Sequence, residues 1–334
     1  MNQSYDDILG ENDLKNYFRT AVASGKVGHA YIISGEKGSG RHMLAEAFAA
    51  ALLCDSPKEG QACMSCPSCR KFSHHSHPDL VEVLHEKPNV ISVDEVRSQL
   101  VNVIATGPLE ARYKVYLIAD AEKMNPAAQN AILKTIEEPP TFAVILLLTD
   151  NKNAFLPTIL SRCICLETKP VREDLIERYL MRNYGQTDYT AAVGAAFAQG
   201  NLGRAIDLVS SEEFHDRREF VVRLMDKLMR GTDYEFEEEI KTLKEEKDHI
   251  DDILNLITIW FRDVLLYKAT GSDEFLIFTS ERSLIRKQAL KASYSYLEKA
   301  FRAIRDARNK LRAHVNFELT TGLLILQLKE IQNG

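Results

Sequence analysis

The chain has 334 residues and a mass of 37.8 kDa, and 45% of its residues are hydrophobic. This length exceeds what one ordinary core supports, so two or three domains are expected. The net charge of −6 argues against a protein that coats nucleic acid through bulk positive charge. Apolar runs such as 142–148 are too short to cross a bilayer, and the N-terminus lacks a basic region followed by an apolar one. We therefore expect no membrane association and a cytoplasmic location.

The beginning of the chain alternates predicted helices and strands. A helix is predicted over 13–24, a buried strand over 30–33 and an alanine-rich helix over 41–53. Residues 79–84 alternate like a strand, and Ser92 opens a further helix through the S-x-x-E pattern of a capping box. A glycine-rich loop joins the first of these strands to the helix that follows, which is the context that a phosphate-binding loop requires.

The alternation continues with two more strands, predicted over 114–120 and 142–148. Between them, Asn125 and Pro126 supply the N-cap and the first residue of a helix. The pattern predicts an α/β domain with a doubly wound parallel sheet, whose ligands bind at the carboxyl ends of the strands. From residue 171 onward the strand signals fade and helical periodicity dominates.

The fold class predicted from this pattern is α/β followed by all-α. We expect an α/β domain over residues 1–168, a small helical domain over 169–210 and a larger helical domain over 211–334. Helices are predicted over 172–183 and 191–210.

The glycine-rich loop has the spacing of a phosphate loop but not its reactive groups. The motif reads G-x-x-x-x-G-K-[ST], where the lysine pairs with phosphates and the hydroxyl binds Mg²⁺. Gly35 and Gly40 have this separation, whereas Arg41 stands in place of the lysine and His42 in place of the hydroxyl. The scaffold is present, and the groups that carry the chemistry are replaced.

A second replacement lies at the end of the strand predicted over 114–120. Asp120 has the position of a metal-binding carboxylate, but Ala121 follows where active ATPases often carry a glutamate that polarises water. Two losses at one site predict that the chain does not hydrolyse ATP. An ATPase in which Arg41 substitutes for lysine is the alternative, and Lys37 with Arg41 could still hold an anion at the helix N-terminus.

Four of the six cysteines form a cluster with the spacing C-x8-C-x2-C-x2-C: Cys54, Cys63, Cys66 and Cys69. Four thiolates complete the tetrahedral shell of a structural Zn²⁺ and leave no position for water. We therefore predict a structural zinc module over about 54–69, with a redox or Fe–S role as the alternative.

Three histidines and few basic residues surround this module. Because four cysteines already complete a metal shell, His74, His75 and His77 are predicted to lie on the surface or behind the ligands. Direct reading of DNA by the module is a third hypothesis. Lys58 is the only basic residue between the first and last cysteine, so the module offers little attraction for phosphates.

Several motifs in combination resemble the AAA+ clamp-loader subunits of bacterial DNA polymerase III. Besides the cysteine insertion and Ala30-Tyr31 before the glycine loop, they are Asp120-Ala121-Glu122-Lys123-Met124-Asn125, Asn130-Ala131-Ile132-Leu133-Lys134-Thr135-Ile136-Glu137-Glu138-Pro139-Pro140 and Leu156-Pro157-Thr158-Ile159-Leu160-Ser161-Arg162-Cys163. They cover about the first 170 residues. The helical remainder is similar to the lid and collar of that family in length and class alone.

Within that family, the altered loop resembles the delta-prime branch rather than the motor subunits called gamma or tau. The resemblance implies a stator, meaning a ring subunit without ATPase activity of its own, in a component of the polymerase holoenzyme. It implies motor and delta subunits as partners, and the sliding clamp and primed DNA as partners through the complex.

The same resemblance implies roles for individual residues. Arg162 is expected to act as an arginine finger, which reaches the ATP site of a neighbouring motor subunit, with Ser161 and Cys163 positioning its turn. Arg204 resembles the sensor-2 arginine of active relatives. Without a competent phosphate loop, we expect Arg204 to serve domain packing.

Overall fold

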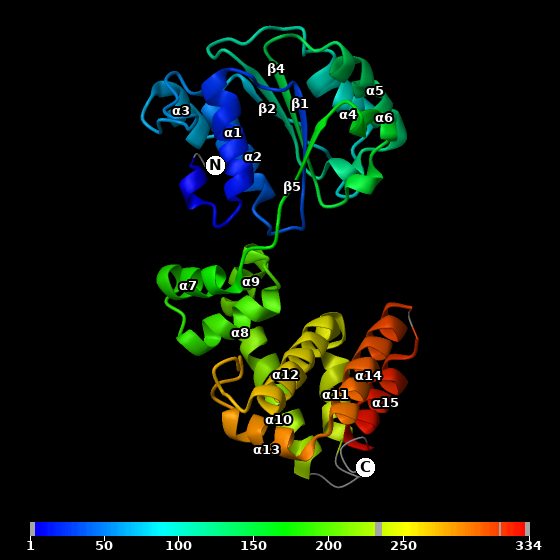
Figure 1. The fold of residues 1–334 in the computed structure, drawn as a ribbon. Helices are drawn as coiled ribbons and strands as arrows, with labels where there is room; N and C mark the ends of the chain where they lie inside the picture. Colours follow the sequence, from blue (N-terminus) through cyan, green and yellow to red (C-terminus); the bar gives the residue numbers. More distant parts are fainter. Residues whose placement is uncertain (1–3, 231–235, 314, 331–334) are drawn as a thin grey trace. The chain divides into compact units, whose positions relative to one another are not determined.

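The computed structural model describes residues 4–230, 236–313 and 315–330 (Figure 1). Residues 1–3, part of the N-terminal segment in which we expect no export signal, lie outside the described residues. Among the described helices, none combines the length and the apolar character that crossing a membrane requires.

The chain divides into two compact units. The first contains the residues up to Leu175 together with Gly200–Gly203, and the second contains Ile176–Gln199 and the residues from Arg204 onward. A border between a small and a larger helical domain near residue 210 stays a prediction.

A five-stranded parallel sheet forms the centre of the first unit, with the order β2-β3-β4-β1-β5. Its strands are β1 (Ala30–Ser34), β2 (Leu80–Glu82), β3 (Lys114–Ile118), β4 (Ala143–Thr149) and β5 (Ile164–Glu167). Every residue of β1, β3 and β4 is buried, because helices cover both faces of the sheet. The predicted α/β class with a parallel sheet is confirmed.

Helices lie on both sides of the sheet (Figure 1). One side carries α1 (Asn12–Ser24), α2 (Arg41–Leu53) and α3 (Pro67–Ser73), and the other carries α4 (Val93–Val96), a π-helical turn (Arg97–Val101) and α5 (Pro126–Glu137). Alternate strand residues face the two layers. Tyr31 and Ile33 pack in the first layer, whereas Ile32 packs in the second.

Local capping explains where two of these helices begin. Ser92 Oγ accepts a hydrogen bond from the backbone N–H of Glu95 at 3.3 Å, and the Glu95 carboxylate accepts one from the Ser92 N–H at 2.7 Å. The capping box predicted from the sequence is therefore confirmed. Asn125 caps α5 by accepting from the N–H of Ala128 at 2.8 Å.

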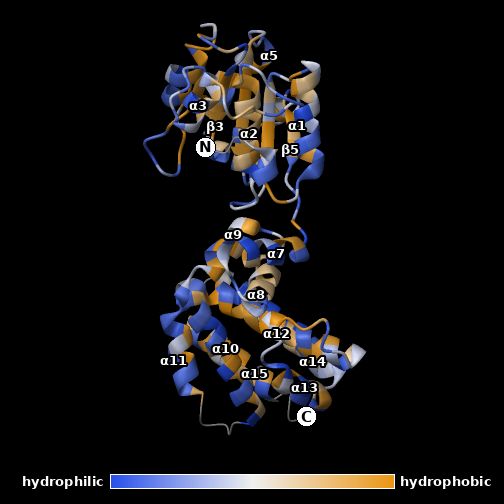
Figure 2. Ribbon diagram, turned by 90° about the vertical axis from the view of Figure 1, so that its left-hand side faces the viewer, coloured by the Kyte–Doolittle hydropathy of each residue, from blue (hydrophilic) through white to orange (hydrophobic). Residues whose placement is uncertain are grey.

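Helices build the described part of the second unit. They are α7 (Glu173–Tyr184), which begins at the end of the first unit, α8 (Asp188–Ala198), α9 (Leu202–Val209), α10 (Glu212–Arg230), α11 (Glu237–Glu245), α12 (Ile250–Thr270), α13 (Arg282–Lys291), α14 (Tyr294–Arg312) and α15 (Phe317–Glu330). Hydrophobic residues extend along α12 (Figure 2), and its Trp260 is fully buried. Trp260 Nε1 donates to Gln288 Oε1 at 2.7 Å, which satisfies the buried indole.

The single helix predicted over 191–210 is wrong. The chain breaks between α8 and α9, where Gln199 and Gly200 have positive φ values of 51° and 87°. A Cβ on Gly200 would lie 2.5 Å from the Cβ of Pro170, so the turn depends on glycine. The break brings Gly200–Gly203 into the first unit.

Candidate functional site

The glycine-rich loop connects the end of β1 to the start of α2. Gly40, at the N-terminus of α2, has a φ of 87°, a conformation that favours glycine. A Cβ on Gly35 would lie 1.9 Å from the hydroxyl oxygen of Thr168, so this position also requires glycine. Both glycines that the sequence motif predicted are therefore explained by close packing and backbone conformation.

The Arg41 side chain turns back onto its own loop. Its guanidinium donates to the carbonyl of Gly35 and lies 3.5 Å from Asp120 Oδ1, and 9% of the side chain is exposed. His42 is exposed to solvent. In this arrangement acceptors of the protein itself, the Gly35 carbonyl and Asp120, engage the guanidinium.

Asp120 is held between two cations. Lys123 Nζ lies 2.9 Å from its Oδ2, and Arg41 approaches its Oδ1. The hydrogen bond from Lys123 and the charges of Lys123 and Arg41 hold the pKa of Asp120 below its usual value. Both carboxylate oxygens thus have partners, a role of Lys123 that sequence reasoning did not assign.

The Gly200–Gly203 segment packs against the glycine-rich loop. Asn201 Nδ2 donates to the carbonyl of Lys37 at 2.8 Å, and the N–H of Gly203 donates to the carbonyl of Gly38 at 2.9 Å. A Cβ on Gly203 would lie 2.6 Å from the Cα of Gly38. Loop carbonyls are therefore bound by the chain's own donors.

Arg204 follows directly and belongs to the second unit. Its guanidinium carbon lies 5.0 Å from the centre of the Phe197 ring, and its Nη2 lies 3.5 Å from Asp252 Oδ1. These contacts are a cation–π interaction and an ion pair within the helical unit. A packing role for Arg204 stays a prediction.

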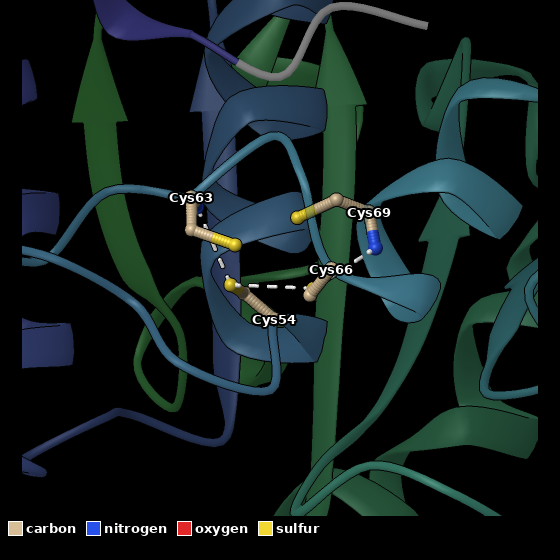
Figure 3. A group of neighbouring side chains, drawn as sticks. All are labelled: Cys54, Cys63, Cys66 and Cys69. Carbon is tan, nitrogen blue, oxygen red and sulfur yellow. Dashed lines mark hydrogen bonds between the residues drawn. The ribbon is translucent and has the colours of Figure 1, made fainter.

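The four clustered cysteines meet at the end of α2 and the start of α3 (Figure 3). Their sulfur atoms all lie within 4.8 Å of one another, and the Sγ atoms of Cys54 and Cys66 are 3.9 Å apart. A tetrahedral zinc site with Zn–S bonds of about 2.3 Å has sulfur atoms about 3.8 Å apart. The cluster therefore has the dimensions and the ligand type to bind a metal ion.

Backbone N–H groups donate hydrogen bonds to sulfurs of the cluster. The N–H of Cys63 donates to Cys54 Sγ and that of Cys69 donates to Cys66 Sγ, each at 3.3 Å. The N–H of Ser65 lowers the pKa of Cys63 to about 5, which favours its thiolate, whereas burial raises the pKa of Cys54. Donors to sulfur stabilise the charged form that ligates metal.

The histidines beside the cluster lie outside its sulfur shell. His74 and His75 are exposed, and His77 is buried. The ring Nδ1 of His77 accepts from the N–H of Asp79 at 3.1 Å, and its Nε2 lies 3.1 Å from the hydroxyl of Ser68. His77 therefore contacts the first turn of α3 through Ser68.

The cysteine insertion is fastened to α1 through Gly60, which has a φ of 74°. A Cβ at this position would lie 2.0 Å from the carbonyl oxygen of Arg19.

We expect Gly60→Ala to destabilise the first unit by more than the roughly 1 to 2 kcal/mol that left-handed backbone costs an L-residue, since the added Cβ would also clash with the Arg19 carbonyl. Urea unfolding of the variant and the wild-type chain measures this loss of stability. Gly25→Ala is the matched control, because Gly25 has a φ of 68° and its nearest neighbour lies at 4.0 Å. Equal losses for both variants would contradict the contact.

Arg162 lies after the short helix α6 (Pro157–Leu160), at the turn before β5. Its Nε lies 2.8 Å from Glu137 Oε1, and 39% of its side chain is exposed. Its Nη1 donates to the carbonyl of Thr158 at 3.0 Å and to Ser161 Oγ at 3.1 Å. The guanidinium is held at the surface, and Glu137 is a partner that sequence reasoning missed.

Cys163, the third residue of this turn, is partly buried. Burial raises the pKa of its thiol to about 12, so the side chain stays neutral at physiological pH. Its N–H donates to the carbonyl of Ile159 at 3.1 Å. These features fit a structural residue of the turn rather than a reactive thiol.

Comparisons with known proteins match both parts of the chain. A family model described as DNA polymerase III, delta subunit, matches residues 10–172, and one described as its C-terminal part matches residues 211–330. DNA polymerase III subunit delta-prime of Bacillus subtilis is 28% identical over 93% of each chain. The delta-prime subunit of Pseudomonas aeruginosa is 42% identical over 41% of this chain and 42% of its own.

A solved structure, the DNA polymerase III gamma subunit-related protein of Thermotoga maritima, aligns with 96% of this chain and 100% of its own at 19% identity and a TM-score of 0.46. The two family matches cover both the α/β domain and the helical remainder of the chain. The chain belongs to the DNA polymerase III delta-prime family and is a subunit of the clamp loader.

Proposed function

We propose that this subunit acts as a stator, which takes part in clamp loading without hydrolysing ATP. The observation that carries the proposal is the arrangement of Arg41, whose guanidinium binds the Gly35 carbonyl and Asp120. A working site needs a lysine free to reach phosphates and a carboxylate free to bind Mg²⁺. In this chain the corresponding groups bind each other.

Arg162 is the residue that we assign to catalysis, acting in trans. A guanidinium stabilises the charge that spreads over the transferring phosphoryl oxygens, and its forked donors suit that geometry. Arg162 is exposed and bound to Glu137 at the surface, so a neighbouring subunit can reach it. Ser161 supports the assignment, since its hydroxyl accepts a hydrogen bond from the same guanidinium.

Cys54, Cys63, Cys66 and Cys69 are proposed to hold a structural Zn²⁺. Bound zinc would tie the end of α2 to the start of α3 and thereby order the insertion. The site has four cysteines, so no position is left for water or substrate. The module is a structural element in this proposal and takes no part in hydrolysis.

The proposed partners are the motor subunits gamma or tau and the delta subunit. The sliding clamp and primed DNA would be contacted through the complex, in the cytoplasm. Clamp loading by the reconstituted complex, with and without this chain, tests the proposal. We expect loading to require the chain, and loading at the full rate without it would overturn the stator role.

ATP turnover by the isolated chain provides the second test. Radiolabelled ATP should be hydrolysed no faster by the wild-type chain than by an Asp120→Ala control, because Asp120 is already engaged by Arg41 and Lys123. Turnover above that control would favour instead an ATPase in which Arg41 replaces the usual lysine.

A further inference from the structure

A cavity of about 210 Å³ opens in the second unit, among the end of α8, the first half of α12 and the middle of α14. Its floor is apolar and includes Phe197, Ile259, Phe301 and Ile304. Helices α12 and α14 pack against each other along this region (Figures 1 and 2). The proposed function uses none of these residues.

Two arginines of α14 stand at this cavity, three residues apart and therefore on one face of the helix. Arg305 is exposed and has no ion-pair partner among the described residues. Arg308 Nη2 donates to Asn255 Oδ1 at 2.6 Å, and its Nε lies 3.5 Å from Asp251 Oδ1. The cavity thus combines an apolar floor with one uncompensated positive charge and a second, positioned guanidinium.

We propose that this cavity binds an acidic peptide segment of a partner protein. One apolar or aromatic side chain of the segment enters the cavity, and carboxylates flank that side chain in the peptide. The apolar floor would receive the side chain, and Arg305 and Arg308 would pair with the flanking carboxylates. We call this cavity the α12–α14 pocket. Peptide binding there is separate from the proposed stator function and does not depend on that function.

The size and charge of the pocket favour a peptide over other ligands. Sites for small molecules enclose about 300 to 1,000 Å³ and cover most of their ligand, whereas 210 Å³ suits a single anchoring side chain. Nucleic acid is held mainly by many cations along its phosphates. Two arginines at one cavity fit a short acidic segment better.

Saturation-transfer NMR on the intact chain tests the proposal with two blocked pentapeptides. One has a central phenylalanine flanked by glutamates, and the other has glutamines in their place. We expect transfer to the phenylalanine ring of the acidic peptide, and a signal about three- to fivefold weaker for the neutral one, as loss of exposed ion pairs implies. Equal signals from both peptides would overturn the proposal.

Variants locate the binding. Arg305→Glu should weaken the signal by a similar factor, and Thr258→Phe should remove it by filling the cavity from a partly exposed position of its lining. Lys299→Glu is the matched control, since it makes the same charge change on α14 at a residue that does not line the cavity. An equal loss in the Lys299 variant would overturn the site. Oligothymidylate could instead displace the peptide from the wild-type chain but not from Arg305→Glu. That outcome would overturn the peptide proposal and assign the pocket to nucleic acid.

Discussion

Replacement of Arg162 by alanine is expected to silence the ATP site of the neighbouring motor subunit in the reconstituted clamp loader. Arginine fingers contribute about 10³ to 10⁵ in rate where they have been defined, so the affected site should contribute almost nothing to DNA- and clamp-stimulated hydrolysis. Single-turnover ATPase assays on the complex measure the loss. Folding and ring assembly should be unchanged, because the side chain is 39% exposed and Arg162 does not belong to the buried cluster of this layer.

Release of Arg162 from its ion pair with Glu137 costs little free energy. Its ion pair with Glu137 joins two side chains that are 39% and 46% exposed, and exposed pairs contribute about 0 to 1 kcal/mol. A γ-phosphate can therefore compete with Glu137 for the guanidinium. Glu137→Gln should retain stimulated hydrolysis, whereas Arg162→Lys should lose most of it, because lysine lacks the forked donors.

Controls separate this role from a general loss of surface charge. Arg172 is also exposed and pairs with Asp174 at 2.6 Å, but it lies outside the Ser161–Cys163 motif. The complex that contains Arg172→Ala should therefore hydrolyse ATP at the rate of the wild-type complex. An unchanged stimulated rate in Arg162→Ala would remove the finger assignment.

The parts of the fold that were predictable are those with local physical signals. Buried strands contain continuous apolar runs such as 115–118, and the side chains of Ser92 and Asn125 mark the starts of two helices. Strand β5 (Ile164–Glu167) was missed because it is short and mostly exposed, which leaves no periodic pattern. Its place beside β1 is a tertiary property that the sequence pattern does not contain.

The break at Gly200 was missed for a related reason. Residues on both sides of it keep helical periodicity, and a single glycine in such a pattern is tolerated in many helices. What decides the outcome is the packing of Gly200 against Pro170 and of Gly203 against Gly38, both of them contacts between residues far apart in sequence. Such contacts cannot be found from periodicity.

The candidate site was predictable in its residue types but not in its bonds. The motif spacing identified Arg41 and Asp120 as replacements or remnants of a nucleotide site, because the required chemistry is position-specific. It did not indicate that Arg41 would bind Asp120 and the Gly35 carbonyl, since an arginine side chain has many rotamers. The pairing of Lys123 with Asp120 was likewise visible only in three dimensions.

Removal of one zinc ligand is the second change with a large expected effect. Structural zinc contributes about 10 kcal/mol or more of binding free energy, which is available to the fold only when the metal is bound. Cys66 is both a proposed ligand and the N-cap of α3, since its sulfur accepts from the N–H of Cys69. Cys66→Ser should therefore lose zinc and loosen the insertion between Leu53 and Phe72.

Two measurements follow these effects separately. Metal analysis should give one zinc per wild-type chain and much less in Cys66→Ser, and limited proteolysis should cut the variant faster between Leu53 and Phe72. Acidification should release zinc from the wild-type chain, because protons compete with the metal for thiolates. Chelation of the wild-type protein should reproduce the proteolytic pattern of the variant.

Cys165→Ser is the matched control for this experiment. Cys165 is an exposed thiol on β5, outside the four-cysteine cluster, so its replacement makes the same chemical change without touching a ligand. That variant should keep its zinc and resist proteolysis like the wild type. Full zinc retention in Cys66→Ser would contradict the ligand set, because three sulfurs and a neutral hydroxyl make a much weaker site than four thiolates.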